Sequence, residues 1–240
     1  YTTDGSEPDQ YTSSVYNGPI RIAGDGTAMT IVAATFDADG NKDQYNYESY
    51  YINYSYTGNS DEGGNSIDGT GSSAKFNNPG MITYDGAENL YVVDSSNYSI
   101  RKVNTATGVV RTVAGSPSSY KSSDGIGTDA SFHIPVGICY GNSLLYVSES
   151  LTYDYIRQIT VPGFVVTTIA GGASGYYDGT PSSARFDAPA GLVYTGGKLF
   201  IADTFNNRIR AYSTSEVTTV STSVLLPIGI TTDDTNLYVT

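Results

Sequence analysis

The sequence has a single cysteine, a single histidine and no tryptophan among its 240 residues. With Cys139 alone, no intrachain disulfide can form, so bridges give no information on the redox compartment. With His133 alone, this chain cannot build a metal site that needs several histidines. Only 15% of the residues are charged, and helix formers such as Leu, Glu and Lys are scarce, which argues against a helical fold.

Basic residues are also few, with 12 Lys and Arg against 24 Asp and Glu, giving a net charge of -12. Nucleic acids bind basic surfaces, so the charge excludes a nucleic-acid partner and disfavours an anionic membrane surface. No apolar run approaches the roughly 18 residues of a membrane helix, and no signal segment opens the chain. The chain starts and stops inside strand-like segments, so we expect it to be part of a longer protein.

Tyrosine is abundant, with 22 residues, and together with Ser, Thr, Gly and Asn it gives a composition typical of β-structure. Three similar stretches then stand out: "DGTGSSAKF", "DGIGTDASF" and "DGTPSSARF" begin at Asp68, Asp124 and Asp178. Their starts lie 56 and 54 residues apart. So regular a period indicates a repeat architecture.

Each Asp-Gly stretch precedes the same series of short segments. A Pro leads to an apolar strand, then to a run closed by an acid ("LYVVD", "LYVSE", "LFIAD"), then to an Arg-containing strand ("SIRKV", "YIRQI", "RIRAY"). The segments "VVRTVAG" and "VVTTIAG" complete the first two units, and a fourth repeat is expected to begin at "VTTV", residues 217–220. Four short strands per unit predict antiparallel meanders that stack radially as a β-propeller.

Two segments, "FNNPGMITYDGAENLYVVDSSNYSIRKV" and "FDAPAGLVYTGGKLFIADTFNNRIRAY", resemble NHL repeats. The resemblance covers roughly residues 60–240. It implies an all-β fold in which residues 53–240 form a partial NHL-type β-propeller, with three full four-stranded blades and part of a fourth. Because propellers have four to eight blades, we expect the ring to be completed by sequence after Thr240 or, as the alternative, by other chains.

Residues 1–52 follow a different pattern. Through "YTTDGSEP", "YNGPIRI" and "MTIVAATFDADGN" they resemble the chitobiase/β-hexosaminidase C-terminal-type domain, a small immunoglobulin-like β-sandwich, here without its first strands. The resemblance implies an accessory module of an exported, extracellular or cell-surface protein, of bacterial origin. Residues 51–60 are either the last strand of this sandwich or the outermost strand of a ring-closing blade.

Acid and arginine recur together in the three units. The pairs are Asp94 with Arg101, Glu149 with Arg157, and Asp203 with Arg210. In the first unit a four-residue turn pairs Asp94 with Ser99, so Arg101 lies diagonally opposite on the same face and contributes roughly 0.2–1 kcal/mol. Three copies favour a structural role over catalysis, and we predict no catalytic residue.

Binding is assigned to the repeated loops, because recognition usually lies on loops held by a rigid scaffold. The predicted binding residues are Asp68, Phe76, Asp124, Phe132, His133, Asp178 and Phe186. A tyrosine cluster offers a second surface, either a stacking platform for sugars or, as we prefer, cross-strand packing in an exposed sheet. Its members are Tyr45, Tyr47, Tyr50, Tyr51, Tyr54 and Tyr56.

The stretch "DADGNKD" is a weak calcium candidate through Asp37, Asp39, Asn41 and Asp43. An EF-hand loop needs Gly at its sixth position, where Lys42 stands, so a strand-to-strand turn fits better. We therefore expect no metal and no cofactor. The neighbours of Cys139 predict a buried thiol rather than a nucleophile.

These features favour a non-enzymatic binding or scaffold protein, exported or at the cell surface, that displays propeller loops to a protein or glycan. One alternative is a subunit of an extracellular filament that assembles through open strand edges. Another is a lyase or hydrolase whose catalytic residues lie outside this sequence. Fold alone cannot choose among them, because propellers host unrelated functions.

Overall fold

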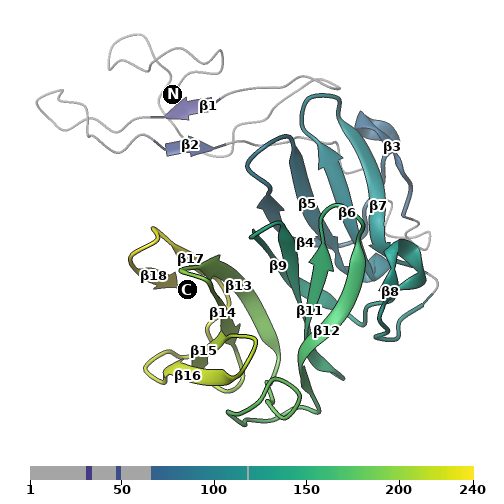
Figure 1. The fold of residues 1–240 in the computed structure, drawn as a ribbon. Coiled ribbons are helices and arrows are strands. Elements are labelled where there is room, and N and C mark those ends of the chain that lie inside the picture. Colours follow the sequence, from purple (N-terminus) through teal and green to yellow (C-terminus); the bar gives the residue numbers. More distant parts are fainter. Residues whose placement is uncertain (1–30, 34–46, 50–65, 118) are drawn as a thin grey trace, which may run out of the picture. The chain divides into compact units, whose positions relative to one another are not determined.

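A computed structural model describes residues 31–33, 47–49, 66–117 and 119–240 (Figure 1). The chain divides into two units, residues 1–57 and 58–240. In the first unit, β1 (Ile31–Ala33) pairs antiparallel with β2 (Tyr47–Ser49). The rest of the predicted sandwich, its boundary at residue 52, the four calcium candidates and the tyrosines other than Tyr47 lie outside the described residues.

Two complete blades open the second unit. Blade 1 consists of β4 (Pro79–Tyr84), β5 (Asn89–Asp94), β6 (Ser99–Asn104) and β7 (Val109–Gly115), with β3 (Gly69–Thr70) along its outer edge. Blade 2 repeats this order with β9 (Pro135–Gly141), β10 (Leu144–Glu149), β11 (Asp154–Thr160) and β12 (Val165–Gly172), edged by β8 (Gly125–Ile126). Neighbouring strands are antiparallel throughout, as the repeat predicts.

Blade 3 contains β13 (Pro189–Thr195), β14 (Lys198–Asp203), β15 (Arg208–Tyr212) and β16 (Val217–Ser221). Two shorter strands, β17 (Ile230–Thr232) and β18 (Leu237–Val239), begin blade 4. The prediction that "VTTV" begins the fourth repeat is wrong, because β16 pairs with β15 and so completes blade 3. The all-β, partial propeller fold is confirmed, with three full blades and part of a fourth.

Among the residues that the structure describes, helical structure is limited to three single turns of 3-10 helix: η1 (Gly71–Ser73), η2 (Ser95–Asn97) and η3 (Gly127–Asp129). Within the described ranges, no helix is long and apolar enough to cross a membrane.

The second and third Asp-Gly loops cross from one blade to the outer edge of the next. After β7, the chain reaches blade 2, where Gly125 and Ile126 pair with Val166 and Val165 of β12 before the chain returns to β9. Unpaired edge strands invite association with other chains, and this excursion pairs with the first two residues of the outer strand β12. Four strands per unit were predicted; in blades 1 and 2 the loop supplies a short fifth strand.

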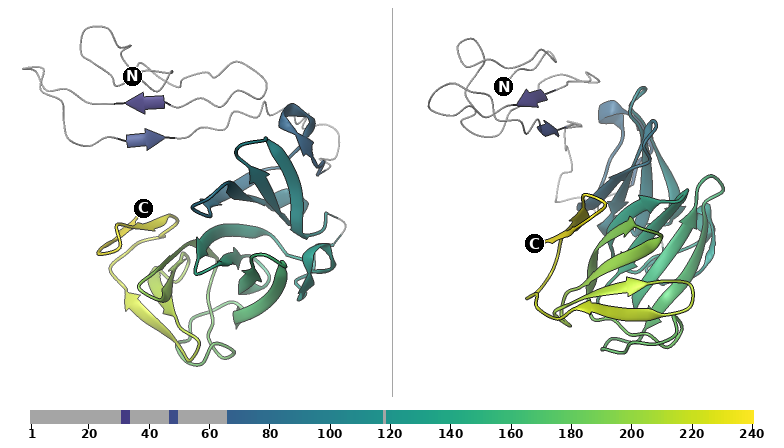
Figure 2. Two further views of the ribbon diagram at one scale, coloured as in Figure 1. Left: turned by 45° about the horizontal axis from the view of Figure 1, so that its top comes forward. Right: turned by 60° about the vertical axis from the view of Figure 1, so that its left-hand side comes forward.

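The blades stack face to face in sequence order, as Figure 2 shows for the coloured part of the chain. Between blades 1 and 2 the core includes Tyr91 and Val93 on one side and Leu145 and Val147 on the other. A second cluster joins blades 2 and 3 and contains Cys139, which is buried as predicted. Burial raises the pKa of the Cys139 thiol, so it stays protonated and packs as a small apolar group.

Blade 1 exposes a face that blades 2 and 3 bury. Ile82, Ile138 and Leu192 occupy the same register position in the innermost strands. The preceding blade reduces the exposure of Ile138 to 4% and of Leu192 to 5%, whereas Ile82 is 55% exposed. The same position of the innermost strand is therefore buried in blades 2 and 3 and exposed in blade 1.

Candidate functional site

A fully buried arginine lies at the centre of each complete blade: Arg101, Arg157 and Arg210 are all 0% exposed. In blade 1, Nη1 of Arg101 donates to Asp94 at 2.8 Å and to the carbonyl oxygen of Lys75 at 2.7 Å. Its Nη2 donates to Asp68 at 3.0 Å and to the carbonyl oxygen of Ile67 at 2.9 Å. One side chain thus ties β5, β6 and the Asp-Gly loop together.

The same contacts recur in the other two blades. Arg157 donates to Glu149, to Asp124 at 2.9 Å, and to the carbonyl oxygens of Ser123 and Ser131. Arg210 donates to Asp203 and Asp178, both at 2.6 Å, and to the carbonyl oxygens of Tyr177 and Arg185. The predicted acid–arginine neighbours are therefore in contact. These pairs are buried more deeply than the exposed cross-strand pairs from which the estimate of 0.2–1 kcal/mol comes.

The phenylalanines that end the Asp-Gly loops pack beneath these arginines. The guanidinium carbon lies 4.8 Å from the ring centroid of Phe76, 5.3 Å from that of Phe132 and 5.0 Å from that of Phe186. Phe132 and Phe186 are completely buried, and Phe76 is half-buried. Cation–π contact of a desolvated guanidinium stabilises this arrangement, so these rings face the interior of the propeller.

The loop aspartates fasten each loop to the outer strand of its blade. One oxygen of Asp68 accepts from the amide and the hydroxyl of Thr112, at 2.8 and 2.9 Å. Asp124 accepts in the same way from Thr168. Partial burial alone would raise the pKa of Asp178, but hydrogen bonds from Thr219 and Arg210 outweigh it and hold this pKa below its usual value.

The strand-end acids also organise the turns. Asp94 accepts from the side chain of Asn97 at 2.9 Å and from the backbone amide of Asn77 at 2.7 Å. At the position of Asn77, blade 2 has His133, whose backbone amide donates to Glu149 at 2.6 Å. This position therefore contributes its amide, whichever side chain it carries.

The imidazole of His133 packs edge-on against Tyr153, with ring centroids 5.8 Å apart. Its Nδ1 atom is buried and has no hydrogen-bond partner. Within the part of the chain that the structure describes, no three His, Cys, Asp or Glu side chains are arranged to hold a metal ion.

A series of hydrogen bonds between blades was missed in the sequence. The hydroxyl that follows each acid donates to a proline carbonyl of the next blade: Ser95 to Pro135, Ser150 to Pro189 and Thr204 to Pro227, at 2.9, 2.7 and 2.7 Å. The signal was visible, because Ser, Ser and Thr follow the acid in "VVDS", "VSES" and "IADT". These bonds fix the stacking of one blade on the next.

Thr204→Val tests these inter-blade bonds. Thr204 is buried, and valine keeps its shape while leaving the Pro227 carbonyl without its donor. We expect the free energy of unfolding to fall by about 1–2 kcal/mol, measured by urea denaturation. Thr218→Val, at an exposed position of β16, is the matched control and should change it by less than about 0.5 kcal/mol. Equal losses in the two variants would contradict the assigned role.

Asp154 at the start of β11 has an unusual environment for an acid. It is 1% exposed; Oδ1 accepts from the amide of Ala188 in blade 3 at 3.0 Å, while Oδ2 has no partner. Burial raises the pKa of Asp154, opposed by the hydrogen bond from the amide of Ala188. Because the folded pKa exceeds the unfolded one, this carboxyl favours folding when protonated, and that stability is lost as pH rises through the folded pKa.

Asp154→Asn should therefore raise the melting temperature at pH 7, by about 2–4 °C, the shift that 1 kcal/mol produces in a chain of this size. The gain should fade as pH falls and the wild-type carboxyl becomes protonated. Asp178→Asn should act oppositely at pH 7, because the lowered pKa of Asp178 means that its ionised form stabilises the fold. Calorimetry between pH 4 and 8 measures both effects. A loss of stability in Asp154→Asn at pH 7 would refute the first.

The two ends of the blades differ in their exposed side chains. We define the crossing face as the end that carries the turns 95–98, 150–153 and 204–207 and the chain crossings between blades. Tyr120, Leu151 and Phe205 lie there and are 66%, 67% and 59% exposed. At the opposite end, the turns between the first two strands of each blade, 85–88, 142–143 and 196–197, contain Asp, Gly, Ala, Glu, Asn and Ser only, although Tyr84 and Ile126 near that end are 49% and 63% exposed. Neighbouring loops of the crossing face thus carry three large exposed apolar side chains.

Comparison with known proteins agrees with both parts of the chain. The chitobiase/beta-hexosaminidase C-terminal domain family matches residues 1–46. Protein SUPPRESSOR OF QUENCHING 1, chloroplastic, from Arabidopsis thaliana is 33% identical over 129 residues, which cover 50% of this chain and 12% of that protein. NHL repeat-containing protein 2 from Homo sapiens is 36% identical over 87 residues, or 35% of this chain and again 12% of the relative.

Solved structures are similar in fold. A structural genomics protein of unknown function from Bacteroides thetaiotaomicron aligns with a TM-score of 0.53 and 23% identity, over 67% of this chain and 44% of that one. A chain of the nidogen/laminin complex aligns with a TM-score of 0.51 and 16% identity, over 68% and 55%. Together with the NHL relatives, these alignments support an NHL-like propeller. The chain spans only about an eighth of the curated relatives that it matches.

Proposed function

We propose that this chain belongs to an exported or cell-surface, bacterial, non-enzymatic protein that binds a protein or glycan partner through its propeller. The observation that carries the proposal is the group of exposed apolar side chains, Tyr120, Leu151 and Phe205, on neighbouring loops of the crossing face. Isolated exposed apolar residues are ordinary, but a group of them on neighbouring loops is typical of an interaction surface. Export is supported by the match of residues 1–46 to a type of accessory domain that accompanies exported proteins.

The buried arginines support the same function. They hold each Asp-Gly loop against its blade through a guanidinium that has no exposed surface. Loops held in this way lose little conformational entropy when a partner binds, which favours affinity. The arginines and acids are thus the scaffold, and the exposed loop residues are the contact surface. The predicted binding role of the loop aspartates stays a prediction.

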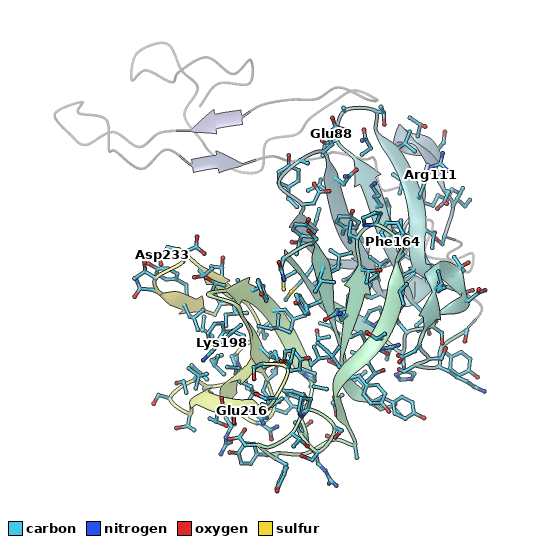
Figure 3. All side chains as sticks on the ribbon, in the orientation of Figure 1. Glu88, Arg111, Phe164, Lys198, Glu216 and Asp233 are labelled. Atoms are coloured by element: carbon cyan, nitrogen blue, oxygen red, sulfur yellow. The ribbon has the colours of Figure 1, made fainter. Side chains whose placement is uncertain are left out.

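Arrays of glycans and of extracellular proteins, probed with the labelled intact protein, test this function. The variant Tyr120→Ala, Leu151→Ser, Phe205→Ala should lose at least about tenfold in affinity for any partner found, since it removes three exposed contact groups. The control variant Glu88→Ala, Lys198→Ala changes exposed residues at the opposite end of the blades (Figure 3) and should bind normally. Equal binding by both variants would contradict the assigned surface.

A filament or assembly subunit is the second candidate, because Ile82 and Tyr84 are 55% and 49% exposed on blade 1. Blade 1 buries the equivalent apolar face of blade 2, and blade 2 buries that of blade 3. A second chain could bury the exposed face of blade 1 in the same way. Light scattering of the intact protein distinguishes the two functions. A monomer at micromolar concentration would contradict assembly, and oligomers that dissociate in Ile82→Ser would support it.

A further inference from the structure

An open groove of about 460 Å³ lies between the end of β12 in blade 2 and the Asp-Gly loop of blade 3. Gly171 and Gly172 form one side, and Tyr176, Tyr177, Ser182 and Arg185 are among the residues that form the other. A Cβ atom at Gly172 would meet no atom within 4 Å, so the backbone there is open to a ligand.

Tyr177 and Arg185 distinguish this loop from its two sister loops. They pair in an isolated β-bridge, which places their side chains next to each other. The equivalent bridges join Ile67 with Lys75 in blade 1 and Ser123 with Ser131 in blade 2. Only the third loop combines an aromatic ring with a guanidinium, although the three loops share their Asp-Gly start and their buried arginine.

Both residues are held in place by the scaffold. Arg210 donates to the carbonyl oxygen of Tyr177 at 2.8 Å and to that of Arg185 at 2.9 Å. A Cβ atom at Gly179 would lie 2.9 Å from Cε1 of Tyr177, so the ring packs against the backbone of this glycine. Tyr177 nevertheless remains 56% exposed. A ring fixed on one side and open on the other can stack against a ligand with little loss of side-chain entropy.

The charge at the groove is opposite to that of the whole chain. In the part of the chain that the structure describes, the exposed Arg185 guanidinium makes no ion pair or hydrogen bond, although the net charge is -12. The guanidinium of Arg208 lies 4.0 Å from the ring centroid of Tyr176. Asp178, the nearby acid, is already paired with Arg210 at 2.6 Å. The groove thus offers a free cation beside an exposed ring.

We propose that this groove binds a uronic-acid residue of an acidic glycan, an assignment that rests on the proposed binding function and names its ligand class. The pyranose ring stacks on Tyr177, because the apolar face of a sugar suits an amphipathic aromatic ring. The carboxylate pairs with the guanidinium of Arg185, whose fork matches carboxylate geometry. The hydroxyl of Ser182 and the open backbone at Gly172 serve the hydroxyl groups of the sugar.

Titration calorimetry of the intact protein tests the proposal with two probes, trigalacturonic acid and a hyaluronan tetrasaccharide, each also as its methyl ester. We expect saturable binding of at least one acid, with about a tenfold or larger loss in Tyr177→Ala, in Arg185→Ala and on esterification. Tyr238→Ala and Arg111→Ala remove an exposed ring and an exposed guanidinium outside the groove, so they should bind within about twofold of wild type.

Binding of neither acid would overturn the proposal, and so would equal affinity for an acid and its ester. An acidic probe whose affinity falls in the Tyr120, Leu151, Phe205 variant but is unchanged in Tyr177→Ala and Arg185→Ala would overturn this site and leave the binding function of the propeller intact. Acid binding that is lost equally in the groove variants and in both controls would also refute the assignment.

Discussion

Arg157→Met is expected to lower the free energy of unfolding by about 3–5 kcal/mol. The substitution removes a guanidinium with no exposed surface and leaves Glu149, also fully buried, without its cation. The carbonyl oxygens of Ser123 and Ser131 lose their donor at the same time. Urea denaturation followed by circular dichroism measures the change, and an unaltered slope would show that the variant still unfolds from a native fold.

Arg111→Met is the matched control, because Arg111 is exposed on the outer strand β7 (Figure 3) and its loss should cost less than about 0.5 kcal/mol. Adding Glu149→Gln to Arg157→Met should recover part of the loss, since it removes the uncompensated buried charge. If Arg157→Met behaved like Arg111→Met, the buried ion pair would not hold the blade together.

The sequence allowed prediction of those parts of the fold that depend on local pattern. Alternating short apolar runs and turns located the blade strands, and "RIRAY" and "VVRTVAG" coincide with β15 and β7. The predicted pairing of Asp94 with Ser99 is the observed register, because a short turn between antiparallel strands leaves few alternatives. The partnership of Asp94 with Arg101 followed from that register.

Contacts between distant segments could not be derived in this way. Asp68 lies 33 residues before Arg101, and their contact depends on the path of the loop along the outer edge of the blade. No local period encodes that path. The joint repetition of loop aspartate, strand-end acid and arginine in all three units was the available signal, and it could have suggested a triad in place of a pair.

Burial is likewise a property of neighbours and not of a motif. Ile82 and Ile138 follow similar Pro-containing starts, yet only Ile138 is covered by another blade. The same reasoning applies to the loop phenylalanines, which were predicted as binding residues from their place in a loop. Their sequence does not reveal that the loop folds back over the blade, with the ring beneath the buried guanidinium.

Phe132→Ala is expected to lower the free energy of unfolding by about 3–5 kcal/mol, the range for a large aromatic side chain removed from a packed core. Phe132 is 0% exposed, belongs to the cluster that joins blades 1 and 2, and lies under Arg157. The lost ring leaves a cavity between two blades and removes the cation–π contact. Denaturation by urea measures the loss, and Phe205→Ala, at a 59% exposed ring, is the control that should cost less than about 0.5 kcal/mol.

The same position separates a structural role from a binding role. Phe132→Leu keeps most of the buried volume and should fold, so any partner captured by the crossing face should bind it with unchanged affinity. Changing a structural ring lowers apparent affinity only because less of the protein is folded. Changing a contact residue lowers the affinity of the folded protein itself. Two results together would contradict this structural role: folded Phe132→Leu loses binding, and Phe132→Ala is about as stable as Phe205→Ala. Phe132 would then be a contact residue and not part of the packed interior.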